Sequence, residues 1–339
     1  MKLLVTGAAG FIGGYLVEDL LSAGHEVVGL DNHSKYGPIV RSYYNHPQFS
    51  FVQGDAKNVA LLKELVSNCD QIVAAAAMIG GIGYFHRFAY DLMAENERIT
   101  ASTFDAAIWA HRDRRLQKIN VISSSMVFES VEEFPTPEGA QWRWPPPRST
   151  YGFQKLATEY FVKGAWEQHR LPYTIVRPFN CVGIGERKAA AEPSIPSGNI
   201  TVALSHVVPD LVQKTAKGQD PLHIFGDGTQ VRHYTYGGDI ARGIRYCIEN
   251  KAALNEDFNI STRVSTTVLE LAAKVWRRMK PGIPFRAVHD EPFEYDVQMR
   301  TPEVSKAERL LGFRAETPLD AILDEVIPWV EEEVRLGLV

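Results

Sequence analysis

The 339-residue sequence contains few cysteines, no long apolar run and no surplus of positive charge. Its three cysteines, Cys69, Cys181 and Cys247, are far apart and odd in number, which favours a reduced compartment over a disulfide framework. No stretch approaches the roughly 20 consecutive apolar residues of a membrane-spanning helix. The formal net charge of -5 gives no general attraction to nucleic acid or anionic lipid. We therefore expect a cytoplasmic protein with no membrane partner and no nucleic-acid partner.

Metal-binding patterns are also missing from the sequence. The ten histidines are scattered, without an H-E-x-x-H motif or a Cys/His cluster, so no bound metal is predicted. What is present is an ordinary globular composition, with 45% hydrophobic and 23% charged residues. At this length the chain can hold one large two-lobed unit or two domains with a sizeable core.

Residues 2–31 have the pattern of a βαβ unit that binds a dinucleotide. The segment KLLVTGAAGFIGG places Gly7, Gly10 and Gly13 directly after a predicted strand and at the start of a predicted helix. The first glycine permits a tight turn, the second lets the backbone approach a pyrophosphate, and the third lets helix and strand pack closely. The start of the helix favours an anion because its N–H groups are free and its dipole is positive there.

An acidic residue ends the second predicted strand of this unit. Asp31 can accept hydrogen bonds from the hydroxyls of an adenine ribose, whereas it would repel a 2′-phosphate. The sequence therefore predicts NAD rather than NADP as the cofactor. Asp55 follows a glycine at the end of another predicted strand, where it is either a turn residue or a contact to adenine. Its position alone favours neither reading.

Strand-length apolar runs and helical segments alternate through the first half of the chain. The runs are FSFVQGD, QIVAAAA, QKINVISSS and YTIVRPF, and long helices are predicted at about 88–111 and 151–169. This alternation is typical of a parallel sheet with helices on both faces. The predicted fold is α/β, a doubly wound parallel sheet of the Rossmann type with a smaller C-terminal α/β substrate lobe.

The chain is predicted to divide near its middle. Residues 1–180 are expected to form the NAD-binding domain, and residues 181–339 the substrate lobe, with about 231–262 returning to the sheet. The regular alternation loosens in this second half. Helices expected to build the smaller lobe lie at about 201–217, 265–279 and 303–312.

A tyrosine and a lysine share one face of the second long helix. In STYGFQK, Tyr151 and Lys155 are four residues apart, so the ammonium can lie near the phenol. A nearby positive charge lowers the pKa of a tyrosine and makes the phenolate usable as a base. In isolation such a pair is more often a packing residue and a solvated charge. Its combination with the glycine turn and with Ser124, in the hydroxyl-rich strand end ISSS, favours a catalytic site.

These motifs resemble the extended short-chain dehydrogenase/reductase family, and within it the NAD-dependent nucleotide-sugar epimerases and dehydratases. The UDP-glucose and UDP-glucuronate 4-epimerases are the members that the chain resembles most. The resemblance runs over nearly the whole chain. It rests on TGAAGFIGG, Asp31, Gly54 with Asp55, Asn96 with Ala106 and Ala107, SSSMVF, YGFQK, Arg177 to Asn180, FGDGTQVRHY and SKAERLLGF.

The resemblance implies a role for each matching residue and a nucleotide-diphosphate sugar as substrate. The residues assigned to the catalytic group are Ser124, Tyr151 and Lys155, together with Ser125. Those assigned to the cofactor are Gly7, Gly10, Phe11, Ile12, Gly13, Asp31, Asn32, Asp55, Ala56, Ala75, Ala76, Asn96, Tyr151 and Lys155. Those assigned to the substrate are Met78, Gly81, Met126, Asn180, His206, Arg232 and Arg300.

Two of these substrate residues carry separate arguments. Arg232 suits a diphosphate because a guanidinium stays charged and forms two parallel hydrogen bonds, although a solvated surface arginine is the alternative. His206 stands where the family's galactose epimerases have an asparagine, so its role stays open.

The residues after Ser124 separate the candidate reactions. Resembling dehydratases have Asp-Glu directly after the catalytic hydroxyl, whereas Ser125 and Met126 stand here and neither carries that proton at neutral pH. Glu129 lies nearby and is interpreted as a loop residue. Epimerisation at C4 needs no second acid or base, because the keto sugar can turn over and receive the same hydride on its other face. The sequence therefore favours a nucleotide-sugar 4-epimerase with tightly bound NAD⁺.

Two alternatives stay open, as do the nucleotide and the sugar. C3/C5 epimerisation or an atypical dehydration is the second enzyme reading. Residues 74–86, AAAAMIGGIGYFH, resemble the substrate loop of GDP-mannose 3,5-epimerase, and they are either a tight loop over the hexose or a glycine turn that leads into a helix. That enzyme's cysteine acid/base corresponds to Met126 here, and its partner lysine to Val207. A non-catalytic protein that senses NAD is the alternative from another class, and the intact catalytic group argues against it. The resemblance also implies a homodimer formed through the two long helices.

Overall fold

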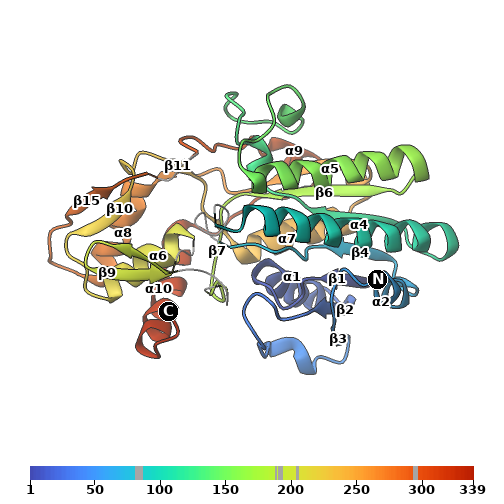
Figure 1. Cartoon of the computed structure of the whole chain (residues 1–339), viewed down its shortest axis with the longest axis horizontal. Coiled ribbons are helices and arrows are strands. Elements are labelled where there is room, and N and C mark those ends of the chain that lie inside the picture. The colour runs from blue at the N-terminus through green and yellow to red at the C-terminus, as the bar shows by residue number, and fades with distance from the viewer. Residues whose placement is uncertain (81–86, 188, 190–193, 204–205, 293–296) are drawn as a thin grey trace.

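A large α/β lobe and a smaller lobe beside it form the protein (Figure 1). The computed structural model describes residues 1–80, 87–187, 189, 194–203, 206–292 and 297–339. Both lobes are built from segments that are separated in the sequence, and the chain crosses between them more than once.

A seven-stranded sheet forms the centre of the large lobe. Its strands are all parallel and follow the order β13-β6-β5-β4-β1-β2-β3. Strand β5 is buried along its whole length because helices cover both faces of the sheet. The sheet confirms the predicted doubly wound fold. The strands are β1 (Lys2–Thr6), β2 (Glu26–Asp31), β3 (Phe49–Gln53), β4 (Gln71–Ala74), β5 (Lys118–Ile122), β6 (Tyr173–Pro178) and β13 (Glu256–Ile260).

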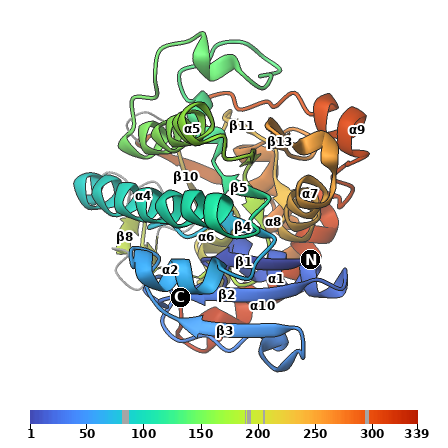
Figure 2. The ribbon, with the colours of Figure 1, turned by 90° about the vertical axis from the view of Figure 1, so that its right-hand side faces the viewer.

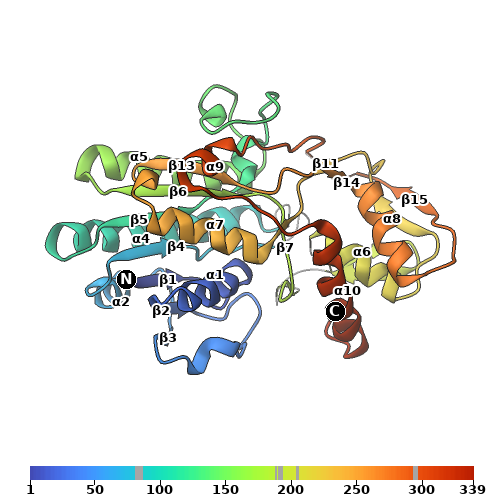
Figure 3. The ribbon, with the colours of Figure 1, turned by 180° about the vertical axis from the view of Figure 1, so that it is seen from behind.

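Two layers of helices cover this sheet (Figures 2 and 3). One face carries α1 (Phe11–Ser22), α7 (Gly237–Glu249) and α9 (Ser305–Leu311), and the other carries α2 (Val59–Val66), α4 (Ala89–Asp113) and α5 (Thr150–His169). Short 3-10 helices lie at η1 (Ser42–Asn45), η2 (Ser125–Phe128), η3 (Ala140–Trp142) and η4 (Lys251–Ala253). The strand order reverses between β1 and β4, which opens a crevice at the carboxyl ends of these strands.

The smaller lobe packs around Leu211, Val275, Trp276 and Val326. Its helices are α6 (Val207–Ala216), α8 (Val268–Met279) and α10 (Leu319–Arg335). Its strand pairs are β10 (Leu222–Phe225) with β15 (Ala287–Asp290) and β8 (Ser194–Ser197) with β9 (Ile200–Ala203). The structure describes two further strand pairs: β7 (Cys181–Val182) with β12 (Thr235–Tyr236), and β11 (Val231–Arg232) with β14 (Thr266–Thr267).

One predicted helix of the smaller lobe belongs to the large lobe instead. The segment at about 303–312 forms α9, whose Ala307 and Leu311 pack into the same core as α1 and α7. The smaller lobe receives α10 in its place, through Ile322, Leu323 and Val326. Both segments are amphipathic, and only the long-range packing decides which core each of them covers.

The return to the sheet also begins later than the predicted residue 231. Val231 and Arg232 pair with Thr266 and Thr267, outside the seven-stranded sheet. The chain enters the large lobe with α7 and then adds β13 beside β6. The helix predicted at about 201–217 starts at Val207, because the residues up to Ala203 form β9 instead.

A buried ion-pair network joins α5 to the sheet. Arg177 on β6 and Glu159 on α5 are both 0% exposed, and Nε and Nη2 donate to the two carboxylate oxygens at 2.7 and 2.9 Å. Nη1 of Arg177 donates to Asp257 at 2.7 Å. The Glu159 carboxylate also accepts from Ser123 Oγ at 2.6 Å and from Gln141 Nε2 at 2.8 Å. Because each charge has several partners, the network can remain ionised inside the protein.

Replacing Glu159 by glutamine is expected to destabilise the fold strongly. The amide keeps the shape of the side chain but leaves the buried Arg177 guanidinium without its main counter-charge. Breaking a buried pair in this way lowers the free energy of unfolding by about 3–5 kcal/mol, which urea denaturation would measure. Glu332→Gln, which removes an exposed partner of Arg335, is the control and should leave the unfolding midpoint unchanged. Equal effects of the two substitutions would contradict this reading.

Candidate active site

A cavity of about 700 Å³ runs along the carboxyl edge of the sheet and into the smaller lobe. Residues of both lobes line it, which places the predicted cofactor and substrate residues around one space. The predicted site residues that line it are Gly7, Gly10, Phe11, Ile12, Gly13, Asp31, Asn32, Asp55, Ala56, Ala75, Ala76, Met78, Ser124, Ser125, Met126, Tyr151, Lys155, Asn180, His206, Arg232 and Arg300. Gly81 lies outside the described residues.

The glycine turn between β1 and α1 has no room for side chains. Gly7 has a positive φ of 74°, and a Cβ there would lie 2.9 Å from Ala76 Cα. A Cβ on Gly13 would lie 2.0 Å from the carbonyl oxygen of Gly7. Gly10 caps the N-terminus of α1. The turn therefore presents bare backbone and the positive end of a helix to the cavity, which suits a pyrophosphate.

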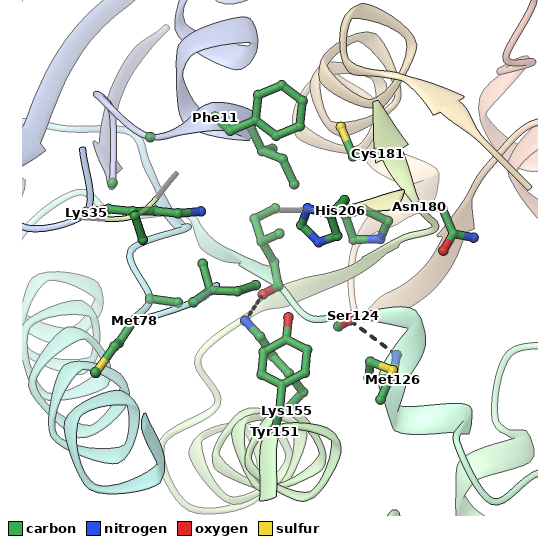
Figure 4. A pocket seen from close by; sticks show the side chains of 18 of the residues that line it. Phe11, Lys35, Met78, Ser124, Met126, Tyr151, Lys155, Asn180, Cys181 and His206 are labelled. Atoms are coloured by element: carbon green, nitrogen blue, oxygen red, sulfur yellow. Dashed lines mark hydrogen bonds between the residues drawn. The ribbon is translucent and has the colours of Figure 1, made fainter. Parts of the chain in front are cut away.

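Asp31 is fixed against the glycine turn by backbone donors. Its Oδ2 accepts from Ala9 N at 3.0 Å and its Oδ1 from His33 N at 2.7 Å. Both oxygens retain lone pairs for the hydroxyls of a ribose. Lys35 from the same loop also lines the cavity and points into it (Figure 4).

Arg41 is a residue of this region that sequence reasoning missed. Its Nη2 donates to Ala9 O at 2.8 Å and to Gly10 O at 3.1 Å, so it fixes the carbonyls on the outside of the glycine turn. Arg41 follows Asp31 by ten positions in a loop, and no short motif marks such a contact.

Asp55 is a turn residue that also lines the cavity, while its contact with adenine remains a prediction. Its Oδ1 accepts from Lys57 N at 2.8 Å, as expected of a turn residue. The same residue lines the cavity next to Ala56. Lys57 in turn pairs with Glu95 of α4, which adds a charged rim to this end of the cavity.

Asn96 is not among the residues that line this cavity, and its role as a cofactor contact remains a prediction. It is 2% exposed, and both halves of its amide are used by one backbone segment. Oδ1 accepts from Met78 N at 2.6 Å and Nδ2 donates to Met78 O at 3.0 Å. Asn96 therefore shapes the loop after β4, in which Ala75, Ala76 and Met78 face the cavity.

Ser124, Tyr151 and Lys155 meet at the carboxyl end of β5 (Figure 4). Tyr151 and Lys155 lie in the first two turns of α5, which Ser149 caps by accepting from Gly152 N. Ser124 forms a hydrogen bond with the Tyr151 hydroxyl, and its Oγ accepts from the backbone N of Met126 at 3.2 Å. Lys155 Nζ donates to Ile122 O at 3.1 Å.

The pKa of Tyr151 differs from the prediction. Burial raises it to about 12, while the hydrogen bond with Ser124 and the charge of Arg300 act in the opposite direction. Burial also lowers the pKa of Lys155 to about 8, and the Glu159 carboxylate opposes that shift. The ammonium bonds the Ile122 carbonyl, so Arg300 takes the place predicted for Lys155 as the charge that favours the phenolate.

The residues after Ser124 provide no acidic group to the reacting centre. Met126 lines the cavity, and its sulfur lies 2.8 Å from Arg300 Nη2. Glu129 turns away, where Oε1 accepts from Arg148 N and Ser149 N at 2.9 Å each. Its other oxygen accepts from the Ser149 hydroxyl, so Glu129 supports the start of α5, in agreement with its interpretation as a loop residue.

The predicted substrate residues lie where the cavity enters the smaller lobe. Asn180 has a positive φ of 37°, and its Nδ2 is buried without a hydrogen-bond partner among the described residues. His206 caps the N-terminus of α6 and pairs with Glu186. Arg232 on β11 lines the same region. No group of three or more metal-ligating side chains occurs within the described ranges.

These features define an NAD-binding α/β enzyme whose cavity extends into a second, smaller lobe. The chain belongs to the NAD dependent epimerase/dehydratase family, whose model matches residues 3–261. In the part of the chain that the structure describes, no helix is both long and apolar enough to cross a lipid bilayer.

Three relatives illustrate the similarity. The low-salt glycan biosynthesis protein Agl12 of Haloferax volcanii is 29% identical, over 87% of this chain and 90% of its own. The putative UDP-glucose 4-epimerase of Methanocaldococcus jannaschii is 28% identical, over 98% and 99%. The solved UDP-glucuronic acid 4-epimerase of Bacillus cereus, in complex with UDP-glucuronic acid and NAD, matches with a TM-score of 0.82, 25% identity and coverage of 98% and 99%.

Replacing Lys155 by methionine is expected to stabilise the cofactor-free protein at pH 7. The folded-state pKa of about 8 lies below the ordinary value of 10.5, so the unfolded state binds more protons between these values. Wild-type stability therefore rises with pH in this window, whereas the methionine variant has no such dependence. The variant should be more stable by about 3 kcal/mol at pH 7, and this advantage should disappear between pH 8 and 10.5. A constant difference across this range, in chemical denaturation, would contradict the assignment.

Proposed function

We propose that the protein is a nucleotide-sugar 4-epimerase that holds NAD⁺ tightly and works through a transient 4-keto sugar. The observation that carries this proposal is the pair of hydroxyls of Ser124 and Tyr151 on the cavity wall, with Met126 where an acid would serve elimination. The acidic residues that line the described part of the cavity are Asp31, Asp55, Glu95 and Asp210, which belong to its other regions.

The residues around the glycine turn fit NAD. Gly7, Gly10 and Gly13 leave backbone for the pyrophosphate, and Asp31 offers its carboxylate to the adenine ribose. The resemblance of YGFQK to the family implies that Lys155 contacts the nicotinamide ribose. NAD⁺, when bound, supplies the acceptor for the hydride from C4 and returns that hydride to the keto carbon.

Tyr151 acts as the acid and base in the proposed reaction. Its Oη takes the proton of the C4 hydroxyl, while the Ser124 hydroxyl donates a hydrogen bond to the same sugar oxygen. Burial raises the pKa of Tyr151, whereas Ser124 and Arg300 act to lower it. These two residues therefore assist the proton transfer. Tyr151 then returns the proton to the opposite epimer. Between the two steps the keto sugar must present its other face, which requires it to turn within the cavity.

The nucleotide diphosphate is placed toward the smaller lobe. Arg232 and the N-terminus of α6, both at the cavity, provide a guanidinium and free backbone N–H groups for the phosphates. Asn180 adds an amide donor that has no hydrogen-bond partner among the described residues. The solved relative from Bacillus cereus, which holds UDP-glucuronic acid and NAD together, supports this class of substrate.

The proposed reaction should convert an NDP-sugar into its 4-epimer without exchange of carbon-bound hydrogen with solvent. Purified protein would be incubated in D₂O with UDP-, GDP-, CDP- and dTDP-sugars, and products analysed by mass spectrometry and proton NMR. A product of unchanged mass without deuterium is expected. Loss of water, or deuterium at C3 or C5, would show elimination or C3/C5 chemistry instead.

Tyr151→Phe should lower turnover at least about 100-fold, the contribution expected of a positioned acid/base, and keep the bound NAD. Tyr90→Phe, at a tyrosine that is 77% exposed, is the matched control and should have wild-type activity. Turnover by the Tyr151 variant at the wild-type rate would refute the mechanism.

The long helices α4 and α5 form the proposed homodimer interface. Phe153, Tyr160 and Phe161 of α5 are 42%, 58% and 36% exposed, and they line an apolar groove with Ala101 and Ile108 of α4. Large aromatic side chains on adjacent helices are costly to leave in water, and a second copy of the same helix pair would cover them.

Tyr160→Glu should convert the dimer into a monomer, because it places a charge at the centre of the apolar groove. The mass in solution would be measured by light scattering after gel filtration. Val264→Glu, at a residue of the smaller lobe that is 64% exposed, is the control and should remain dimeric. A wild-type protein that is monomeric at micromolar concentration would refute the interface.

A further inference from the structure

The end of the cavity in the smaller lobe contains a buried ion pair. Asp210 and Lys214 lie one turn apart on α6, are 5% and 0% exposed, and both line the cavity. Lys214 Nζ lies 2.8 Å from Asp210 Oδ2 and donates to His223 O at 3.2 Å. The same ammonium lies 4.6 Å from the centre of the Phe225 ring. The positive charge is therefore satisfied by the protein.

The negative charge is only half satisfied. Asp210 Oδ1 is buried and has no hydrogen-bond partner among the residues that the structure describes. Burial raises the pKa of Asp210, although Lys214 acts against this shift. A buried acceptor without a donor is costly, so an N–H group of a ligand in the cavity would stabilise this site. A carboxylate oxygen can only accept, which restricts the ligand to one that donates.

The surroundings of the pair suit a flat ring. Val208 and Leu211 of α6, Ile224 and Phe225 of β10, and Val268 line this end of the cavity with apolar groups. A planar base can pack between such walls and still present one polar edge to a buried pair.

The order of groups along α6 suits a nucleoside diphosphate. His206, at the start of α6, faces the same space as Tyr151 and Lys155 (Figure 4). Asp210 lies about one helical turn beyond it, with the phosphate-binding groups between the reacting centre and this end. A sugar at Tyr151 and a base at Asp210 are thus connected through the proposed diphosphate position.

We propose that Asp210 and Lys214 bind the base of the nucleotide-sugar substrate and that they select guanine over the other bases. This inference rests on the proposed function and names the nucleotide that it takes. Guanine presents two adjacent donors, N1–H and the N2 amino group, to the carboxylate, and its O6 can approach the ammonium. Uracil and thymine offer one N–H between two carbonyl oxygens, so an oxygen would face the carboxylate. Cytosine and adenine place a ring nitrogen lone pair beside their amino group, with the same repulsion.

Binding of nucleoside diphosphates without a sugar tests this proposal independently of the epimerase chemistry. Calorimetry on the purified protein with its NAD would compare GDP, UDP, CDP, dTDP and inosine diphosphate, which lacks the N2 amino group. GDP is expected to bind at least about tenfold more tightly than any of the others, the factor that one charge-assisted hydrogen bond contributes. UDP or dTDP binding as tightly as GDP would overturn the proposal, as would equal binding of GDP and inosine diphosphate.

Variants assign the selectivity to the pair. Asp210→Asn should weaken GDP about tenfold and leave UDP binding nearly unchanged, because the amide cannot accept two donors at once. Asp324→Asn, at an exposed carboxylate of α10, is the control and should keep the GDP preference. An unchanged preference in the Asp210 variant would overturn the assignment.

Two further results separate the possible failures. If none of the diphosphates binds, the proposed function fails along with the inference. If the Asp210 variant does not fold, the comparison of GDP with inosine diphosphate on the unaltered protein decides.

Discussion

The buried carboxylate of Glu159 is the interaction on which the geometry of the reacting centre depends. It lies one helical turn after Lys155 and two turns after Tyr151, and it bonds Arg177 of the sheet and Ser123, the neighbour of Ser124. Helix α5 and the end of β5 are therefore held in one register by a single charged group. This arrangement holds Tyr151 on α5 and fixes the short segment that carries Ser124 at the end of β5, which is what a preorganised site requires. The Glu159 charge also acts against the fall in the pKa of Lys155, so the same group affects position and protonation.

The sequence allowed the parts of the fold with a local cause to be predicted. Gly7 and Gly13 were recognised because a tight turn and a close helix contact exclude a side chain, and a Cβ at either position would collide with backbone. Helices α4 and α5 lie at the two long helical segments predicted at about 88–111 and 151–169. The error in the fold concerns long-range packing instead. Helix α9 was assigned to the wrong lobe because its apolar stripe alone does not say which core it meets.

Electrostatics at the site was the least predictable part, because it depends on residues that are distant in sequence. A lysine four residues after a tyrosine predicted a lowered tyrosine pKa, whereas burial of the phenol outweighs the opposing effects of Ser124 and Arg300 and raises that pKa. The charge that acts on the phenol belongs to Arg300, which comes from the far end of the chain. In the proposed reaction, burial of this kind excludes water from the keto sugar and strengthens each remaining charge interaction, at the expense of stability. The opposite shifts of Tyr151 and Lys155 thus have one cause, the removal of both side chains from solvent.

Packed side chains join the two lobes around the cavity, so a substrate could be held at one end while its sugar ring rotates at the other. Tyr15 on α1, the helix that follows the glycine turn, accepts a hydrogen bond from Ile184 N at 2.9 Å and packs against Tyr236, with ring centroids 5.6 Å apart. Tyr236 in turn bonds Glu325 of α10 at 3.2 Å. The cofactor side and the nucleotide side of the cavity are therefore joined by packed aromatic groups.

In the proposed reaction the nucleotide anchors the substrate in the smaller lobe, while the apolar Met78 and Met126 offer the keto sugar few polar contacts at the reacting centre. A site that eliminates water must hold the sugar ring in one orientation against an acid and a base. In 4-epimerisation the ring must instead stay bound and still be free to rotate. Anchoring at one end and weak contact at the other satisfy that requirement.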